Sequence, residues 1–164
     1  DRYEQQNGIT EPVSIEKIKL YTKLDDVKKA SNELLKLIRK FPDKSEYLSL
    51  LAELYFNYNQ DKKGLQILDR ILKAEPDNGF VHFYLADYYR SKKELKEADR
   101  HTKEALVSDK IENGYKIQYI LKLILNPDTT LTSDSQLDNY MNLLMQKYSD
   151  DLSVRALHSD FLNL

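Results

Sequence analysis

Cysteine is absent from the chain, and its 164 residues include only four glycines and four prolines. Without cysteine there can be no disulfide, no thiolate metal site and no cysteine nucleophile, although the redox compartment stays open. No apolar run approaches the roughly 18 residues that span a bilayer, so direct membrane insertion is not expected. The net charge of −2 gives no electrostatic case for nucleic acid or an anionic membrane, because both call for a basic patch or stripe.

The chain does have a soluble globular composition, 41% hydrophobic and 32% charged, with enough apolar surface for one continuous core. Its first residue is Asp1 rather than methionine, so we expect a processed product or an excised piece from which any signal peptide has been removed.

Twelve tyrosines could form a stacking platform for bases or sugars. Since lysines and arginines do not alternate with them on one face, nucleic-acid binding is a minor alternative.

The stretch 45–78 predicts a helix, a short polar turn, a second helix and a proline stop. Apolar residues recur at steps of three and four in each half, which gives each helix one apolar stripe. The two stripes consist of Leu48, Leu51, Ala52 and Tyr55, then Leu65, Leu68, Ile71 and Leu72. The two helices must pack on each other. Gly64 costs about 1 kcal/mol relative to alanine inside a helix, so its presence indicates close packing.

This pattern returns with a period of 34 residues, which separates Pro42 from Pro76 and Tyr55 from Tyr89. A helical hairpin repeated at that period is typical of a tetratricopeptide-type solenoid. The sequence resembles the tetratricopeptide repeat (TPR) family, whose repeat has apolar, small, aromatic and proline residues at fixed positions. From position 45 those places hold Leu51, Ala52, Tyr55, Gly64, Leu68, Ile71 and Pro76. From position 79 they hold Leu85, Ala86, Tyr89, Ala98, Thr102 and Ala105, with Lys110 in place of proline.

The resemblance implies an all-α, right-handed superhelical TPR-like solenoid of antiparallel helix pairs, and we expect a single domain over residues 1–164. Its predicted parts are the tail of a preceding repeat (1–8), repeats at 11–44, 45–78 and 79–112, a repeat with a lengthened loop (113–150), and the first helix of a truncated repeat (151–164). Lys17 and Ile18 depart from the pattern, so the first helix of 11–44 should pack less tightly. The partial repeats at both ends indicate a segment of a longer array.

A constellation of catalytic residues is missing. The HExxH, GxSxG, P-loop and dinucleotide-binding motifs are all absent. His82, His101 and His158 fall on different predicted helices, and the place of His82 is normally used for packing, so we expect a half-buried structural histidine. The acidic pairs at 25–26 and 150–151 lie in a turn and at a helix junction, where carboxylates favour capping over metal binding. We therefore expect no enzyme activity, no cofactor and no metal.

In the resembled family, a peptide lies in a concave groove lined by the second face of each first helix. Residues two apart on a helix point about 200° away from each other, so positions two, five, nine and twelve of a repeat face away from the partner helix. The resemblance thus assigns the groove to Glu46, Ser49, Glu53, Phe56, Phe80, Phe83, Asp87, Arg90, Ile117, Leu121 and Ile124, with Gly114 at the remaining position. A clamp for acidic tails is disfavoured, since lysines and asparagines are missing from the places where such clamps have them.

The apolar members of this set have two explanations. They bind an apolar partner segment, for instance a helix laid into the groove, or they are covered by neighbouring repeats or by a second copy of the chain. We expect a noncatalytic module that binds a protein or peptide partner or acts as a scaffold, and a homo-oligomer is an open alternative.

The runner-up interpretation is a structural spacer or self-association segment of a larger exported TPR assembly factor. The stretch 41–60, FPDKSEYLSLLAELYFNYNQ, is similar to long TPR proteins of Bacteroidetes-type bacteria, which often carry a signal peptide. This similarity favours the bacterial periplasm or export, with the cytoplasm as the alternative. The sequence does not identify the partner.

Overall fold

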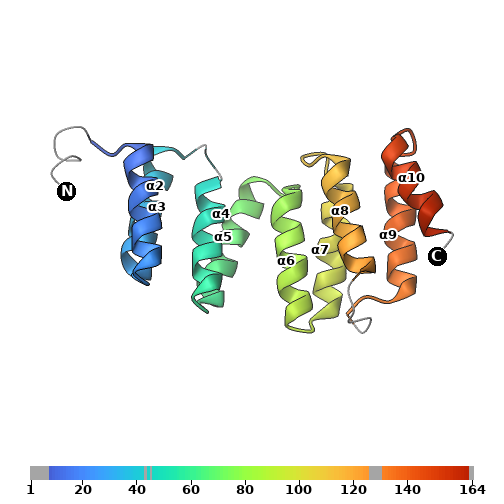
Figure 1. The fold of residues 1–164 in the computed structure, drawn as a ribbon, viewed down its shortest axis with the longest axis horizontal. Helices are drawn as coiled ribbons and strands as arrows, with labels where there is room; N and C mark the ends of the chain where they lie inside the picture. The colour runs from blue at the N-terminus through green and yellow to red at the C-terminus, as the bar shows by residue number, and fades with distance from the viewer. Residues whose placement is uncertain (1–7, 43, 45, 126–130, 163–164) are drawn as a thin grey trace. The chain divides into compact units, whose positions relative to one another are not determined.

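The structure is a computed structural model that describes residues 8–42, 44, 46–125 and 131–162. Every regular element in these ranges is an α-helix. The predicted all-α class is therefore confirmed, and Figure 1 shows the helices following one another along the chain. The chain divides into two compact units, Asp1–Ala74 and Glu75–Leu164, which we describe separately. Of the repeat tail predicted at 1–8, all but Gly8 lies outside the described residues, as do positions 126–130 of the lengthened loop.

The first unit contains α2 (Glu11–Lys23), α3 (Val27–Lys40), α4 (Glu46–Asn57) and α5 (Asp61–Ala74), each packed on the next. Its core consists of Ala30, Leu34, Leu37, Ile38, Tyr47, Leu51 and Leu54. Ser14 is the one fully buried residue of helix α2, whose Ile15, Ile18 and Tyr21 are partly buried against this core.

Gly64 lies where α5 approaches α4. A Cβ atom at this position would stand 2.6 Å from the Phe56 ring, which is closer than real side chains come. Close packing therefore explains the glycine, as predicted. Phe56, whose ring fills this space, is itself one of the residues predicted to face the groove.

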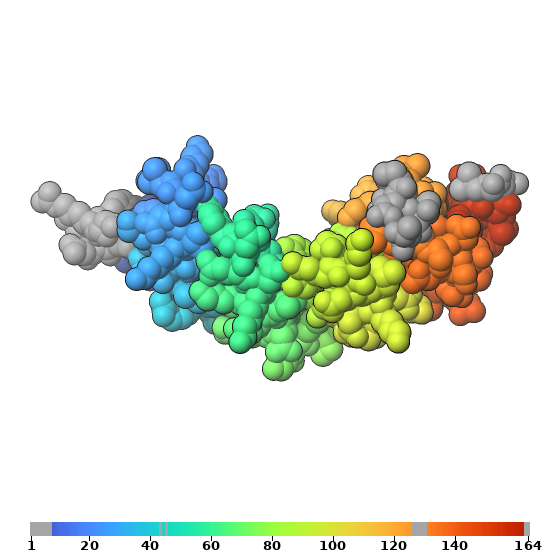
Figure 2. All heavy atoms as spheres, turned by 90° about the horizontal axis from the view of Figure 1, so that it is seen from below, coloured from blue at the N-terminus to red at the C-terminus, as the bar shows by residue number. Residues whose placement is uncertain are grey.

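The second unit contains α6 (Gly79–Ser91), α7 (Leu95–Val107), α8 (Asn113–Ile124), α9 (Asp134–Lys147) and α10 (Leu152–Phe161). Helix α6 pairs with α7, and α9 packs on α7, α8 and α10 (α9 is orange and α10 red in Figure 2). Helix α8 also packs on α10, so first helices lie beside first helices and second helices beside second helices. The core of this unit includes Ala86, Ala105, Leu106, Ile120, Leu123, Tyr140, Met141, Leu144 and Val154.

Side-chain caps fix the first residue of several helices. The Ser133 hydroxyl accepts a hydrogen bond from the Gln136 N–H, and the Gln136 side chain accepts one from the Ser133 N–H, which forms a capping box at α9. Ser133 is thus the N-cap of α9. Asp26, Asn78 and Asp151 cap α3, α6 and α10 in the same way, each accepting from a backbone N–H in the first turn.

The first helix of three successive pairs is followed by a residue in the same left-handed conformation. These residues are Asp25 (φ 55°), Asn59 (φ 56°) and Lys93 (φ 62°), at 34-residue intervals. The N–H of the following residue donates back to a tyrosine carbonyl: Asp26 to Tyr21 at 2.9 Å, Gln60 to Tyr55 at 2.8 Å, and Glu94 to Tyr89 at 2.9 Å. This is the Schellman arrangement that ends many helices. The backbone conformation therefore repeats with the same 34-residue period as the side-chain pattern.

We expect Lys93→Gly to stabilise the protein by about 1 kcal/mol, because the left-handed conformation strains every residue except glycine and, to a lesser degree, asparagine and aspartate. The matched control is Lys92→Gly, since Lys92 has a right-handed φ of −87° and gains nothing from glycine. Urea melts of both variants measure the effect. A loss of stability in Lys93→Gly would contradict this account of the turn.

Candidate binding groove

A hollow of about 480 Å³ lies between α8 and α10 in the second unit. Its lining residues are Ile117, Leu121, Ile124, Leu125, Ser153, Ala156, Leu157, Asp160 and Phe161. The α8 members stand at i, i+4, i+7 and i+8, a spacing that places them on one side of a helix. The lining is therefore apolar on both helices, with one hydroxyl and one carboxylate. We call this hollow the α8/α10 groove.

Three of the residues predicted from the TPR resemblance meet in this groove: Ile117, Leu121 and Ile124. Leu121 is 40% exposed, and Leu125, beside it at the end of α8, is 78% exposed. Large apolar side chains that stay this accessible in a concave site can be covered by a partner.

The α6 residues predicted for the groove have different surroundings. Phe80 is exposed, and its ring meets the edge of the Tyr115 ring at a centroid distance of 5.3 Å. Phe83, in contrast, is only 8% exposed and stacks on the Tyr119 ring at 4.0 Å. Phe83 therefore packs between α6 and α8, in agreement with the second of the two explanations given for the apolar set, in which neighbouring repeats cover it.

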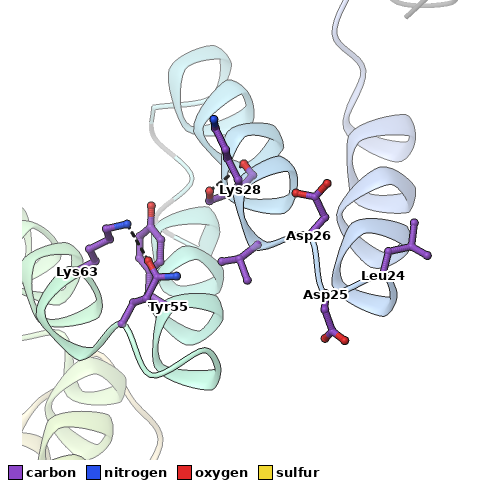
Figure 3. A pocket seen from close by; sticks show the side chains of 9 residues that line it. Leu24, Asp25, Asp26, Lys28, Tyr55 and Lys63 are labelled. Atoms are coloured by element: carbon purple, nitrogen blue, oxygen red, sulfur yellow. Dashed lines mark hydrogen bonds between the residues drawn. The ribbon is translucent and has the colours of Figure 1, made fainter.

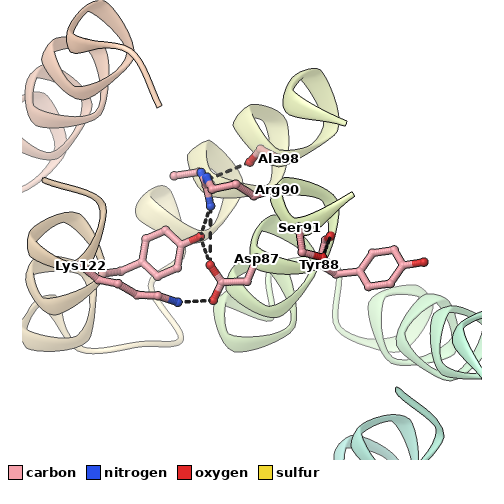
Figure 4. Close-up of polar contacts among 8 residues, drawn as sticks. Asp87, Tyr88, Arg90, Ser91, Ala98 and Lys122 are labelled. Atoms are coloured by element: carbon pink, nitrogen blue, oxygen red, sulfur yellow. Dashed lines mark hydrogen bonds and ion pairs between the residues drawn. The ribbon is translucent and has the colours of Figure 1, made fainter. Parts of the chain in front are cut away.

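Arg90 and Asp87 belong to a polar network that joins α6 to α7 and α8 (Figure 4). The buried Arg90 guanidinium donates to the Tyr119 hydroxyl (2.8 Å) and to Thr102 Oγ1 (3.3 Å). The Tyr119 hydroxyl donates to Asp87 (3.0 Å), whose other oxygen accepts from Lys122 (2.6 Å). Burial, followed by the charge of Asp87, raises the pKa of Tyr119 well above its ordinary value. Arg90 is thus a structural residue rather than a groove residue.

The predicted residues on α4 belong to the other compact unit. Glu46, Ser49 and Glu53 are exposed on that helix, and Phe56 is half-buried over Gly64. Gly114, at the start of α8, has open space around it. Of the eleven predicted residues, the three on α8 line one hollow together.

Sequence reasoning missed the α10 wall of the groove. The repeat register places Leu157 and Phe161 at helix-pair positions and assigns no role to Ala156 and Asp160. The signal that could have found this wall is the stacking of repeats, since the first helix of one repeat lies beside the first helix of the next. Residues on the facing side of that second helix must then line any crevice between the two.

Another hollow, of about 750 Å³, lies in the first unit beside the turn between α2 and α3 (Figure 3). Asp25, Asp26, Lys28, Tyr55 and Lys63 are among its lining residues. Most of these charges have local partners: Asp26 pairs with Lys29 (2.8 Å), Asp25 accepts from the Tyr58 hydroxyl (3.0 Å), and Lys63 donates to Gln60 (2.7 Å). Nowhere in the described ranges do three or more metal-binding side chains gather. This hollow is therefore a weaker candidate than the α8/α10 groove.

Lys116 is a fully buried lysine that the sequence reasoning did not single out. Its ammonium lies 3.8 Å from the centre of the Tyr148 ring and donates to Asn113 Oδ1 (3.1 Å). Asn113 in turn donates to the Asp151 carboxylate (2.7 Å). Burial lowers the pKa of Lys116 to about 8. Because the side chain has no access to solvent, we assign it to the joint between α8, α9 and α10 and not to catalysis.

His82 and His101 meet inside the α6/α7 pair, with their Nδ1 atoms 2.8 Å apart. His82 Nε2 lies 2.9 Å from the Pro76 carbonyl and must donate to it, so His82 Nδ1 accepts from His101. His101 Nε2 then accepts from Arg100 (2.8 Å), and the Tyr89 ring stacks on His101. Every ring nitrogen is satisfied only while both imidazoles are neutral. Burial, then the charge of Arg100, lowers the pKa of His101 from 6.5 to about 4, and Glu97 acts in the opposite direction.

The described helices include none that is long and apolar enough to cross a membrane.

Comparisons with known proteins agree with this architecture. The chain matches no family model. It is 29% identical over 96 residues to interferon-induced protein with tetratricopeptide repeats 2 of Mus musculus, covering 56% of this chain and 20% of that protein. It is also 29% identical over 55 residues to the Cricetulus griseus protein of the same name, covering 34% of this chain and 12% of that protein. The chain thus spans a fifth or less of the length of these relatives.

Among solved structures, the chain is similar to a thermophilic TPR protein of Thermus thermophilus. The TM-score is 0.54 and the identity 16%, over 99% of this chain and 87% of that one. At this identity the likeness concerns the fold alone. The resemblance to TPR proteins is therefore confirmed, and the chain has the all-α fold of a TPR solenoid.

The histidine pair predicts a specific pH dependence. His101 becomes protonated near pH 6.5 in the unfolded chain but only near pH 4 in the folded chain. The contribution of neutral His101 to the free energy of unfolding is therefore fully present above pH 6.5 and is lost as the pH falls toward 4. Between pH 7 and pH 5 this loss is about 2 kcal/mol. His101→Asn should reduce the pH dependence of the free energy of unfolding, measured by urea melts, by that amount. Equal pH dependence in wild type and His101→Asn would refute the assignment.

Phe83 and Leu121 should respond oppositely to an added charge. Phe83→Glu places a carboxylate in the packed contact with Tyr119, which should cost about 3 kcal/mol or more. Leu121→Lys stays on the surface and should change the free energy of unfolding by about 0.5 kcal/mol or less. Thermal melts compare the two variants directly. A large loss of stability in Leu121→Lys would show that Leu121 is packed in the folded protein and that the α8/α10 groove is not open.

Proposed function

We propose that the chain is a noncatalytic interaction module that holds an apolar segment of a partner protein in the α8/α10 groove. The observation that carries this proposal is the groove itself, a concave site with aliphatic and aromatic walls and with Leu121 and Leu125 exposed at its side. A partner that covered these side chains would gain about 25 cal/mol for each Å² of apolar surface removed from water.

The fold supports a protein as the partner. Helical repeat solenoids present extended surfaces built from successive first helices, and an apolar groove between two helices suits an apolar segment of another chain. The exposed rings of Phe80 and Tyr115 add a further apolar contact on α6 and α8 of the same unit. They would widen the surface available to a longer partner segment.

The noncatalytic part of the proposal rests on where the reactive groups lie. Lys116 is fully buried, and His82 and His101 are satisfied by each other, by Pro76 and by Arg100. Neither group reaches the α8/α10 groove, whose lining offers only Ser153 and Asp160 as polar side chains. We therefore assign the groove to binding rather than to a reaction.

A second candidate function is that of a structural spacer or self-associating segment. Helix α2 carries an apolar hollow of about 390 Å³ lined by Pro12, Val13 and Leu20, together with Glu16 and Lys17. On α10, Leu152 and Leu162 are exposed outside the groove. Surfaces of this kind suit neighbouring repeats or a second copy of the chain. Self-association that is lost in Leu20→Lys but retained in Leu121→Lys, measured by light scattering, would favour this candidate.

Affinity capture from the native host tests the proposed function. We expect the wild-type chain to retain a partner, and the Leu121→Lys variant to recover at least tenfold less of it. Charging a hot spot that the partner buries costs about 2 kcal/mol or more. Leu152→Lys is the matched control, since Leu152 is exposed on α10 but does not line the groove. Equal recovery of every partner by wild type and Leu121→Lys, with both variants folded, would overturn the proposal.

A further inference from the structure

The two helices that form the α8/α10 groove run in the same direction. Asn113, the first residue of α8, donates a hydrogen bond of 2.7 Å to Asp151, the N-cap of α10. Their N-termini are therefore side by side, and both helices end at the opposite end of the groove, at Ile124 and Phe161. Each helix C-terminus carries roughly half a negative charge from its aligned peptide dipoles.

The side chains add to the negative charge at that end. Asp160 lines the groove one residue before α10 ends, and within the described ranges its carboxylate has no hydrogen-bond or ion-pair partner. Residues 123–125 and 156–162, which are described at this end of α8 and α10, include Asp160 but no lysine or arginine. The nearest lysine on α8, Lys122, is paired with Asp87. An occupant of the groove would therefore meet an uncompensated carboxylate beside two helix C-termini.

The apolar walls also restrict the backbone of the occupant. The groove offers no hydrogen-bonding side chain other than Ser153 and Asp160, so an extended segment would leave its own N–H and C=O groups unpaired. A helix satisfies those groups internally. From Ile117 to Leu125 the groove follows about 12 Å of α8, which matches about two turns of a bound helix. Such a helix would present apolar residues at i, i+3, i+4 and i+7.

We infer that the α8/α10 groove takes an amphipathic helix of a partner protein that carries a lysine or arginine at the end lying over Asp160. This inference rests on the proposed function and specifies its partner. The apolar stripe of the partner would fill the space between Leu121 and Leu157, and its cation would lie next to the carboxylate and the two helix C-termini. The same charges disfavour an acidic segment.

A displayed library of amphipathic helical peptides tests the inference. The library fixes an apolar stripe and randomises the flanking positions among lysine, glutamate and glutamine. Selection on the wild-type chain should enrich lysine at one end of the stripe. Asp160→Asn should weaken the selected peptides about two- to fivefold, as expected for an exposed charge pair, and repeating the selection on Asp160→Lys should enrich glutamate at that end. Asp138→Lys, an equal charge change on the exposed side of α9, is the matched control and should keep the wild-type preference.

The outcomes separate the two proposals. If no selected peptide depends on Leu121, tested with Leu121→Lys, the proposed function itself fails. If peptides depend on Leu121 but show no preference for lysine, or keep that preference on Asp160→Lys, the function stands and the inference about the partner's charge is overturned. Self-association of the chain that Leu121→Lys abolishes would also overturn it, because a second copy would then occupy the groove.

Discussion

The left-handed residue after the first helix of a pair sets the geometry of the repeats. Asp25, Asn59 and Lys93 reverse the chain within three residues, and each reversal is closed by a hydrogen bond to the carbonyl of the tyrosine five residues before the donor. A short reversal forces the two helices of a pair into close contact. The small residues then follow from that contact, since at Gly64 a methyl group would already collide with Phe56.

The second unit uses buried polar groups where an ordinary repeat would use apolar ones. His82 and Lys116 occupy the same position of successive predicted repeats, and both are buried. Each is satisfied by partners from neighbouring segments, His82 by Pro76 and His101, and Lys116 by Asn113 and the Tyr148 ring. Buried polar groups that lose a partner are costly. These contacts therefore specify how the helices meet.

The α8/α10 groove combines an apolar lining with a carboxylate at one end. Its walls are apolar, and one of its ends is negative because two parallel helices end there beside Asp160. Apolar burial supplies most of the affinity in such a site, while the charge selects and orients the partner. On α6 the first-helix residues Phe83 and Arg90 are buried instead, because Tyr119 of α8 stacks on the Phe83 ring and accepts a hydrogen bond from Arg90.

Local spacing together with short-range steric rules is enough to predict the helices, their period of 34 residues and the close approach at Gly64. The same spacing identifies Ile117, Leu121 and Ile124 as one face of a helix. The burial of Phe83 and Arg90, the meeting of His82 with His101, and the second wall that α10 supplies to the groove emerge only from the packed helices. Those facts depend on which helices lie side by side and on which side chains fill the space between them, and helix periodicity alone does not contain that information.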